Sequence, residues 1–149
     1  MMDLFDTSVL IKAHREDQKN HAFYRELVEQ RARRDEDFAL SSLVASNFVQ
    51  IVTHADFPMG PTPLPQALSV IESLEVLPHC HWVAPGRKNW ALTAGLCREC
   101  ACRGKMVTKA HHASIAIEHA CNWITEDRDF QVFDHHGLRL TLVQPPSSS

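Results

Sequence analysis

The stretch VTKAHHASIAIEHACNWITEDRDF, from Val107 to Phe130, decides the fold of this chain. Residues 107–119 have the apolar spacing of a buried helix, although a lysine, Lys109, stands where that helix should begin. Residues 122–130 read as a strand that runs into a turn carrying Asp127 and Asp129. The stretch therefore predicts a helix followed by a strand that delivers carboxylates to its own carboxyl end.

Short strand-like segments alternate with helical ones through the rest of the chain. Asp6 ends a short apolar run and is followed by Thr7 and Ser8, residue types that cap helices. Further strands are expected at 38–40, 80–85 and 138–143, and further helices within 20–37, 41–54, 63–77 and 86–104, the last ending at Gly104. This alternation predicts an α/β sandwich with a mainly parallel sheet.

Size and composition limit the functional classes. A chain of 149 residues that is 44% hydrophobic predicts one domain, at residues 1–142, with a disordered tail at 143–149. The 15 basic side chains against 18 acidic ones exclude a global basic field of the kind that binds nucleic acids or membranes non-specifically. Because neither a membrane-spanning run nor a signal-peptide pattern is found, we expect a cytoplasmic protein with no membrane association.

The five cysteines are expected to be reduced thiols, most of them in the core. Cys97, Cys100 and Cys102 form a cluster that, with the adjacent histidines 111 and 112, suggests zinc as an alternative. Their spacing does not match the usual arrangement of two pairs of zinc ligands, so helix packing is the favoured interpretation.

Acidic residues follow two of the predicted strands. Asp6 comes after the first strand, and Asp127 and Asp129 come after residues 122–125. Since ligands of open α/β sheets bind at the carboxyl ends of the strands, these acids could gather there and hold a hard divalent cation. The alternative is that each aspartate only caps the start of a helix.

Three segments of the chain resemble the PIN domain family, and especially the VapC-type toxins of bacterial toxin–antitoxin pairs. They are LFDTSVLI at 4–11, LSSLVASNFVQIVTH at 40–54 and the stretch quoted above. The resemblance covers residues 4 to about 140 and implies a three-layer sandwich in which helices flank the central sheet.

The resemblance also implies a function. Members of this family are Mg²⁺- or Mn²⁺-dependent endoribonucleases that cleave single-stranded RNA, are neutralised by a cognate antitoxin and usually form homodimers. Asp6 and Asp127 match the catalytic, metal-binding aspartates of the family, and Asp129 matches a further polar position counted here as a metal ligand. Ser8 and Thr125 match supporting polar positions.

Two positions depart from the family pattern. Asn47 stands where the family has its second acidic residue, and Lys109 stands where an aspartate opens the late helix. A lysine in a cation site repels the metal, and it is expected to pair with Asp6 and Asp127 instead. Asn47 still offers a carbonyl oxygen, which is a weaker ligand than a carboxylate.

Three explanations of these departures remain open. The chain is a degenerate PIN-domain protein that binds antitoxin or RNA without cleaving; or the substitutions were introduced to inactivate a toxic nuclease; or another acid, Glu126 or Asp129, completes a shifted site with the help of a histidine. Whether the chain is an enzyme therefore depends on what surrounds Lys109.

Four further residues carry expectations. Adjacent helical residues point about 100° apart, so at most one of His111 and His112 is expected to face the pocket. The histidine that faces the pocket is expected to be partly exposed. Trp90 is expected in the core. Glu118 and His119 are expected to be capping and surface residues at the end of the helix.

Overall fold

A sheet of five strands, each parallel to its neighbours, forms the centre of the computed structural model, which describes residues 1–34 and 36–146. The strands lie in the order β3-β2-β1-β4-β5. Their bounds are β1 Asp3–Phe5, β2 Phe38–Ser41, β3 Cys80–Val83, β4 Asn122–Thr125 and β5 Arg139–Leu142. The predicted α/β fold is confirmed.

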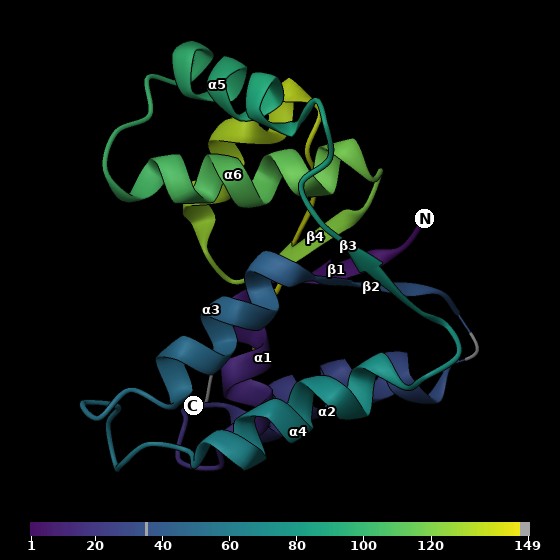
Figure 1. Ribbon diagram of the computed structural model, residues 1–149, viewed down its shortest axis with the longest axis vertical. Helices are drawn as coiled ribbons and strands as arrows, with labels where there is room; N and C mark the ends of the chain where they lie inside the picture. Colours follow the sequence, from purple (N-terminus) through teal and green to yellow (C-terminus); the bar gives the residue numbers. More distant parts are fainter. Residues whose placement is uncertain (35, 147–149) are drawn as a thin grey trace.

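Helices cover both faces of this sheet, so the molecule has three layers (Figure 1). Helices α1 to α4 pack together on one side, and α5, α6 and the 3-10 helix η1 pack on the other. The bounds are α1 Thr7–His14, α2 His21–Arg33, α3 Ser42–Val52, α4 Leu64–Glu75, α5 Asn89–Glu99, α6 Lys105–Glu118 and η1 Arg128–His136.

The pairing of β1 with β4 positions the two segments that carry aspartates. Phe5 is in register with Ile124, so the residues that follow them emerge at the same edge of the sheet. The backbone N–H of Asp6 donates to the carbonyl of Ile124 at 2.9 Å, which extends the pairing by one more bond. Two segments that are far apart in the sequence therefore end side by side.

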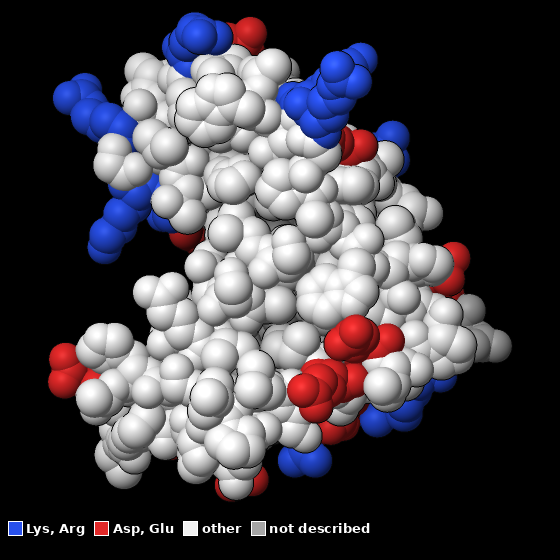
Figure 2. All heavy atoms as spheres, viewed as in Figure 1, with Lys and Arg blue, Asp and Glu red and all other residues white. Residues whose placement is uncertain are grey.

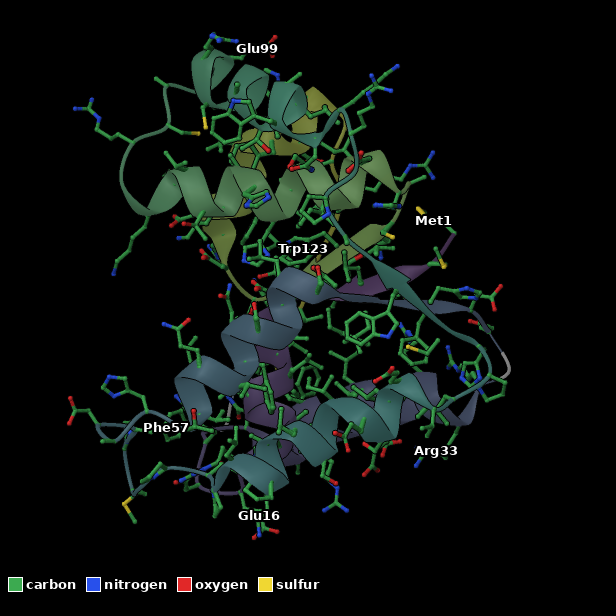
Figure 3. The ribbon with its side chains drawn as sticks, in the orientation of Figure 1. Met1, Glu16, Arg33, Phe57, Glu99 and Trp123 are labelled. Carbon is green, nitrogen blue, oxygen red and sulfur yellow. The ribbon has the colours of Figure 1, made fainter. Side chains whose placement is uncertain are left out.

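The core between the sheet and α6 is built around Trp123, which is completely buried on β4 (Figure 3). The ring of His112 stacks on it with centroids 5.4 Å apart, and Phe130 lies against it at 5.3 Å. Burial of a large aromatic side chain stabilises a fold by roughly 1.5–3 kcal/mol or more. This cluster fixes α6 against the strand that precedes Asp127.

Helix α6 starts earlier than the sequence predicted. It begins at Lys105, so Lys109 lies in its second turn rather than at its first residue. Gly104, which was expected to end α5, instead precedes α6 with a φ of 59°, and α5 already ends at Glu99. The turn between the two helices uses Ala101 at a positive φ of 51°.

Two further expectations differ from the structure or lie partly outside it. Trp90 was expected in the core but is 71% exposed on α5, because its neighbours Asn89 and Thr93 occupy the face that packs on α6. In the expected tail, the N–H of Val143 donates to the carbonyl of Thr125, and residues 147–149 lie outside the described residues. Among the described residues, no helix combines the length and apolarity needed to cross a membrane.

Candidate functional site

A pocket of about 360 Å³ opens at the carboxyl ends of β1 and β4. Its walls come from the starts of α1 and α6, from one face of α3 and from the segment after β4. Figure 2 shows the molecule notched between α3 and α6, with Lys and Arg side chains over the α6 side of the notch. Its lining residues are Asp6, Thr7, Ser8, Ile11, Asn47, Ile51, Lys105, Thr108, Lys109, His112, Asp127 and Phe130.

Asp6 lies at the base of this pocket and is 9% exposed. Its Oδ1 accepts a hydrogen bond from the backbone N–H of Thr7 at 2.6 Å, so Asp6 also caps α1. Its Oδ2 accepts from the hydroxyl of Thr125, also at 2.6 Å. Burial raises the pKa of Asp6 to about 6, although these two hydrogen bonds act in the opposite direction.

Thr125 connects the two aspartates. While its hydroxyl donates to Asp6, its oxygen accepts from the backbone N–H of Asp127 at 3.0 Å. Oδ1 of Asp127 in turn accepts from the N–H of Asp129 at 2.9 Å, which caps η1. Asp6 and Asp127 therefore cap helices, as the alternative explanation expected, and they also line one pocket.

Lys109 takes the position between the acids at the mouth of the pocket. Its ammonium lies 3.0 Å from Oδ2 of Asp127 and also forms an ion pair with Asp129. The expected pairing with Asp127 is confirmed, whereas Asp129 takes the place that was expected for Asp6. The hydrogen bond to Asp129 raises the pKa of Lys109 above its ordinary value, so the side chain remains a cation.

His112 faces the pocket and His111 does not line it, in agreement with the helical geometry. The expected partial exposure was wrong for His112, which is only 6% exposed because it stacks on Trp123. Its Nε2 lies 3.3 Å from the side-chain nitrogen of Asn47. Burial lowers the pKa of His112 to about 4, so the ring is neutral at physiological pH.

Glu126 and Asp129, the acids considered as replacements for the missing carboxylates, lie outside the pocket lining. The Oε2 of Glu126 is 2.6 Å from the ammonium of Lys12 and accepts from the hydroxyl of Tyr24 at 2.7 Å. Asp129 is held by Lys109. Neither acid supplies the carboxylate that Asn47 and Lys109 lack.

Three polar atoms in the pocket lining are buried without a hydrogen-bond partner among the described residues. They are the hydroxyl oxygens of Thr7 and Ser8 and the Nδ1 of His112. Sequence reasoning did not single out Thr7 as a pocket residue. The spacing of Lys109 and His112, three residues apart, was a usable signal, because such residues share one face of a helix.

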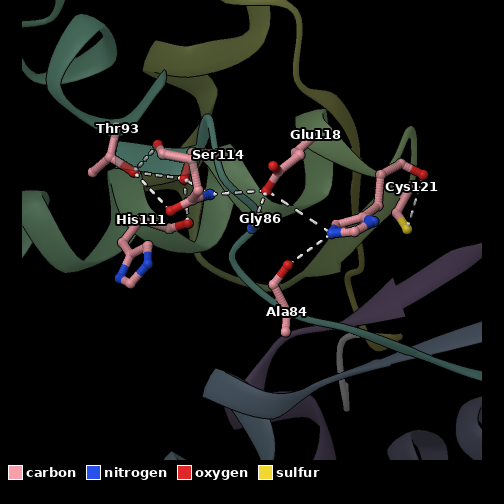
Figure 4. Close-up of polar contacts among 9 residues, drawn as sticks. Ala84, Gly86, Thr93, His111, Ser114, Glu118 and Cys121 are labelled. Carbon is pink, nitrogen blue, oxygen red and sulfur yellow. Dashed lines mark hydrogen bonds and ion pairs between the residues drawn. The ribbon is translucent and has the colours of Figure 1, made fainter. Parts of the chain in front are cut away.

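Glu118 anchors the far end of α6 and is not the surface residue that was expected (Figure 4). Its Oε1 accepts from the backbone N–H of Gly86 at 2.9 Å and from the side-chain amide of Asn89 at 3.3 Å. The same amide donates to the hydroxyl of Ser114 at 3.0 Å, and His119 contacts the carbonyl of Ala84 at 2.8 Å. This network holds α6 against the loop before α5.

Comparison with known proteins decides the family. The sequence matches the PIN domain over residues 4–135. The chain belongs to the PIN domain family. Two mycobacterial relatives resemble this PIN domain over most of their length, and each is 32% identical. Ribonuclease VapC25 of Mycobacterium tuberculosis matches 97% of this chain and 99% of the relative. The VapC ribonuclease Mb2897 of Mycobacterium bovis matches 86% of this chain and 87% of the relative.

Solved structures support the same fold for this PIN domain. It is similar to VapBC2 from Rickettsia felis bound to a DNA fragment from the promoter, with a TM-score of 0.67, 18% identity, and coverage of 95% of this chain and 98% of that chain. It is also similar to VapC20 of Mycobacterium tuberculosis, a toxin that cleaves the sarcin-ricin loop, with a TM-score of 0.64, 12% identity and the same coverage. At these identities the likeness concerns the fold alone.

The residues of this PIN domain do not fit a resident divalent cation as they are arranged. In the part of the chain that the structure describes, no three His, Cys, Asp or Glu side chains come together in a way that could hold a metal ion. Both oxygens of Asp6 accept hydrogen bonds, and Asp127 is occupied by an ammonium. The cysteine cluster likewise forms no such group among the described residues.

Proposed function

We propose that this PIN domain is the toxin of a VapBC-type toxin–antitoxin pair and an endoribonuclease that acts on single-stranded RNA. The observation that carries the proposal is the pocket in which Asp6 and Asp127 meet through Thr125, in a chain 32% identical to VapC ribonucleases. The pocket is open, lies at the ligand-binding edge of a parallel sheet and carries hydrogen-bond donors suited to a phosphate backbone.

The protein partner in this proposal is a cognate antitoxin. Structures similar to this chain include a toxin–antitoxin complex from Klebsiella pneumoniae and VapBC-5 from Mycobacterium tuberculosis, a member of the VapBC family of toxin–antitoxin systems. We also propose that the chain forms a homodimer. A cytoplasmic location is proposed because RNA and a small antitoxin chain meet in that compartment. Co-expression with a candidate VapB-type antitoxin, followed by size-exclusion chromatography, tests both the complex and the homodimer.

The metal requirement of VapC nucleases bears on how the pocket of this chain would work. PIN-domain VapC nucleases generally depend on a divalent metal. In this chain, Mg²⁺ or Mn²⁺ would use the carboxylates of Asp6 and Asp127 and the side-chain carbonyl of Asn47. The carboxylate of Asp127 already forms an ion pair with Lys109. The geometry therefore does not support a metal-bound resting state.

The ion pairs of Lys109 favour a second candidate function. In it the chain keeps the fold and binds antitoxin or RNA, but does not cleave. A fluorescent single-stranded RNA incubated with the purified protein and Mn²⁺ separates the candidates, using wild type, Lys109→Asp and Asp6→Asn. Cleavage by wild type that disappears in Asp6→Asn supports the nuclease. Cleavage by Lys109→Asp alone supports a silenced nuclease, and cleavage by no variant rejects the endoribonuclease proposal.

A further inference from the structure

The unpartnered groups of the pocket are all groups that can donate a hydrogen bond. Thr7 is 7% exposed and His112 is 6% exposed, so water reaches their unpaired atoms poorly. The hydroxyl of Ser8 joins them on the same wall. A buried polar group without a partner costs about 1–3 kcal/mol, so three such groups in one pocket point to a ligand that accepts hydrogen bonds.

Charge and helix orientation favour an anion as this ligand. Both α1 and α6 direct their amino-terminal ends to the pocket, and helix amino termini attract negative charge. Lys105 and Lys109 are among the lining residues, and both carry a positive charge. The acids beside them are Asp6, whose oxygens both accept hydrogen bonds, and Asp127 and Asp129, which share the ammonium of Lys109.

Lys109 can bind an anion without leaving its aspartates. An ammonium has three N–H donors, and the ion pairs with Asp127 and Asp129 use two of them. The side chain is 23% exposed, so the third donor has access to a ligand in the pocket. The two aspartates then hold the lysine in place, which lowers the entropy cost of ordering its long side chain on binding.

We infer that the pocket binds a phosphodiester group of single-stranded RNA directly, without a metal ion, through the ammonium of Lys109 and the hydroxyls of Thr7 and Ser8. The inference rests on the proposed function, since it takes RNA as the partner, and it replaces the metal-mediated contact that the family resemblance implied. The lysine supplies the positive charge at the point where the missing carboxylate would have recruited a cation.

The test measures the affinity of the full chain for a fluorescein-labelled single-stranded RNA of mixed sequence, by fluorescence anisotropy in EDTA. The wild type is expected to bind equally well in EDTA and in Mg²⁺. Lys109→Gln is expected to bind roughly 10-fold or more weakly, since it loses a charged hydrogen bond. Lys88→Gln, an exposed lysine at the start of α5, is the matched control and should retain wild-type affinity.

Salt dependence and stability separate ligand binding from a structural role. Each phosphate contact adds about 0.7 to the slope of log affinity against log salt for a single strand, so Lys109→Gln should lower the slope by that amount. Thr7→Val keeps the shape of the side chain and removes an unpaired hydroxyl. It should therefore raise the melting temperature while weakening RNA binding, a combination that a purely structural hydroxyl would not produce.

Three outcomes overturn the inference. RNA binding that disappears in EDTA and returns with Mn²⁺ shows a metal-mediated contact, and unchanged affinity in Lys109→Gln places the phosphate elsewhere. A thermal shift with inorganic phosphate, in a protein that does not bind RNA, assigns the pocket to free phosphate. The proposed nuclease function is tested separately, because Mn²⁺-dependent cleavage can occur when binding in EDTA fails, and binding in EDTA can occur without cleavage.

Discussion

The ammonium of Lys109 lies 3.0 Å from Oδ2 of Asp127, at the mouth of the pocket whose base is Asp6. One cationic side chain thus stands beside a carboxylate that the resemblance assigns to metal binding. The contact is intramolecular, whereas a metal ion must be taken from solution. The relationship makes the charge at position 109 the main determinant of what the pocket can bind.

Lys109→Asp is expected to create affinity for Mn²⁺ that the wild-type chain lacks. The substitution changes the local charge by two units, and at about 4 Å one unit pair is worth roughly 1–4 kcal/mol depending on solvent screening. Isothermal titration calorimetry should show Mn²⁺ binding by the variant at least roughly 100-fold tighter than by wild type. Adding Asp6→Asn to the variant should abolish the gain, and strong binding by the wild type would contradict the prediction.

Asp6→Asn is expected to stabilise the fold above pH 6. The raised pKa of Asp6, about 6 against 3.8 for the unfolded chain, means that the folded state favours the protonated acid. The ionised form therefore costs stability that increases from pH 4 to pH 6 and reaches at most about 3 kcal/mol. Urea unfolding at pH 8 and pH 4 measures this difference, which should be larger at pH 8.

The control for this prediction is Asp56→Asn, which changes an aspartate whose side chain is 93% exposed. Its effect on the free energy of unfolding should be small at both pH values. If Asp6→Asn destabilised the chain equally at pH 4 and pH 8, the lost hydrogen bond would dominate and the burial of charge would have no measurable cost.

His112 is expected to weaken the fold as the solution becomes acidic. Its pKa is lowered from 6.5 to about 4, so the unfolded chain takes up a proton over this range while the folded chain does not. The neutral ring makes its full contribution to the free energy of unfolding above pH 6.5. This free energy falls by up to about 3 kcal/mol as the pH approaches 4. His112→Phe keeps a ring beside Trp123 and should remove this dependence.

Asp6 and His112 act in opposite directions between pH 4 and pH 6. Acidification relieves the cost of the buried carboxylate and adds the cost of the neutral imidazole. The wild-type free energy of unfolding should therefore change little over this interval, whereas Asp6→Asn should lose stability with falling pH and His112→Phe should gain it. Parallel profiles for all three proteins would rule out both assignments.

Glu118→Ala is expected to loosen α6 from the loop before α5. The variant leaves the N–H of Gly86 without its partner and removes one of the contacts of Asn89, at a cost of about 1–3 kcal/mol. Chemical denaturation should show the loss, while Glu72→Ala, at an exposed position on α4, should be nearly neutral. Equal effects of the two substitutions would mean that solvent replaces the Glu118 contacts.

Much of the fold could be predicted from the sequence because the apolar periodicity is local. The strands before Asp6 and Glu126, and the helix around Ala113, follow from spacing alone. Helix ends were less predictable, since the start of α6 depends on the turn that places Gly104 at a positive φ. Trp90 was misplaced because a propensity for burial does not say which face of a helix meets a neighbour.

The sequence by itself determined the parallel α/β framework and the PIN family membership, and it led to the expectation that Asp6 and Asp127 gather at one edge of the sheet. The tertiary structure decided the chemistry of that edge: Lys109 binds Asp127 and Asp129, Glu126 turns to Lys12 and Tyr24, and His112 is buried on Trp123. The physical reason is that the spacing of residues in the sequence fixes only the position of each residue on its helix or strand. Its charge, partner and protonation depend on groups that only the folded chain brings within a few ångströms.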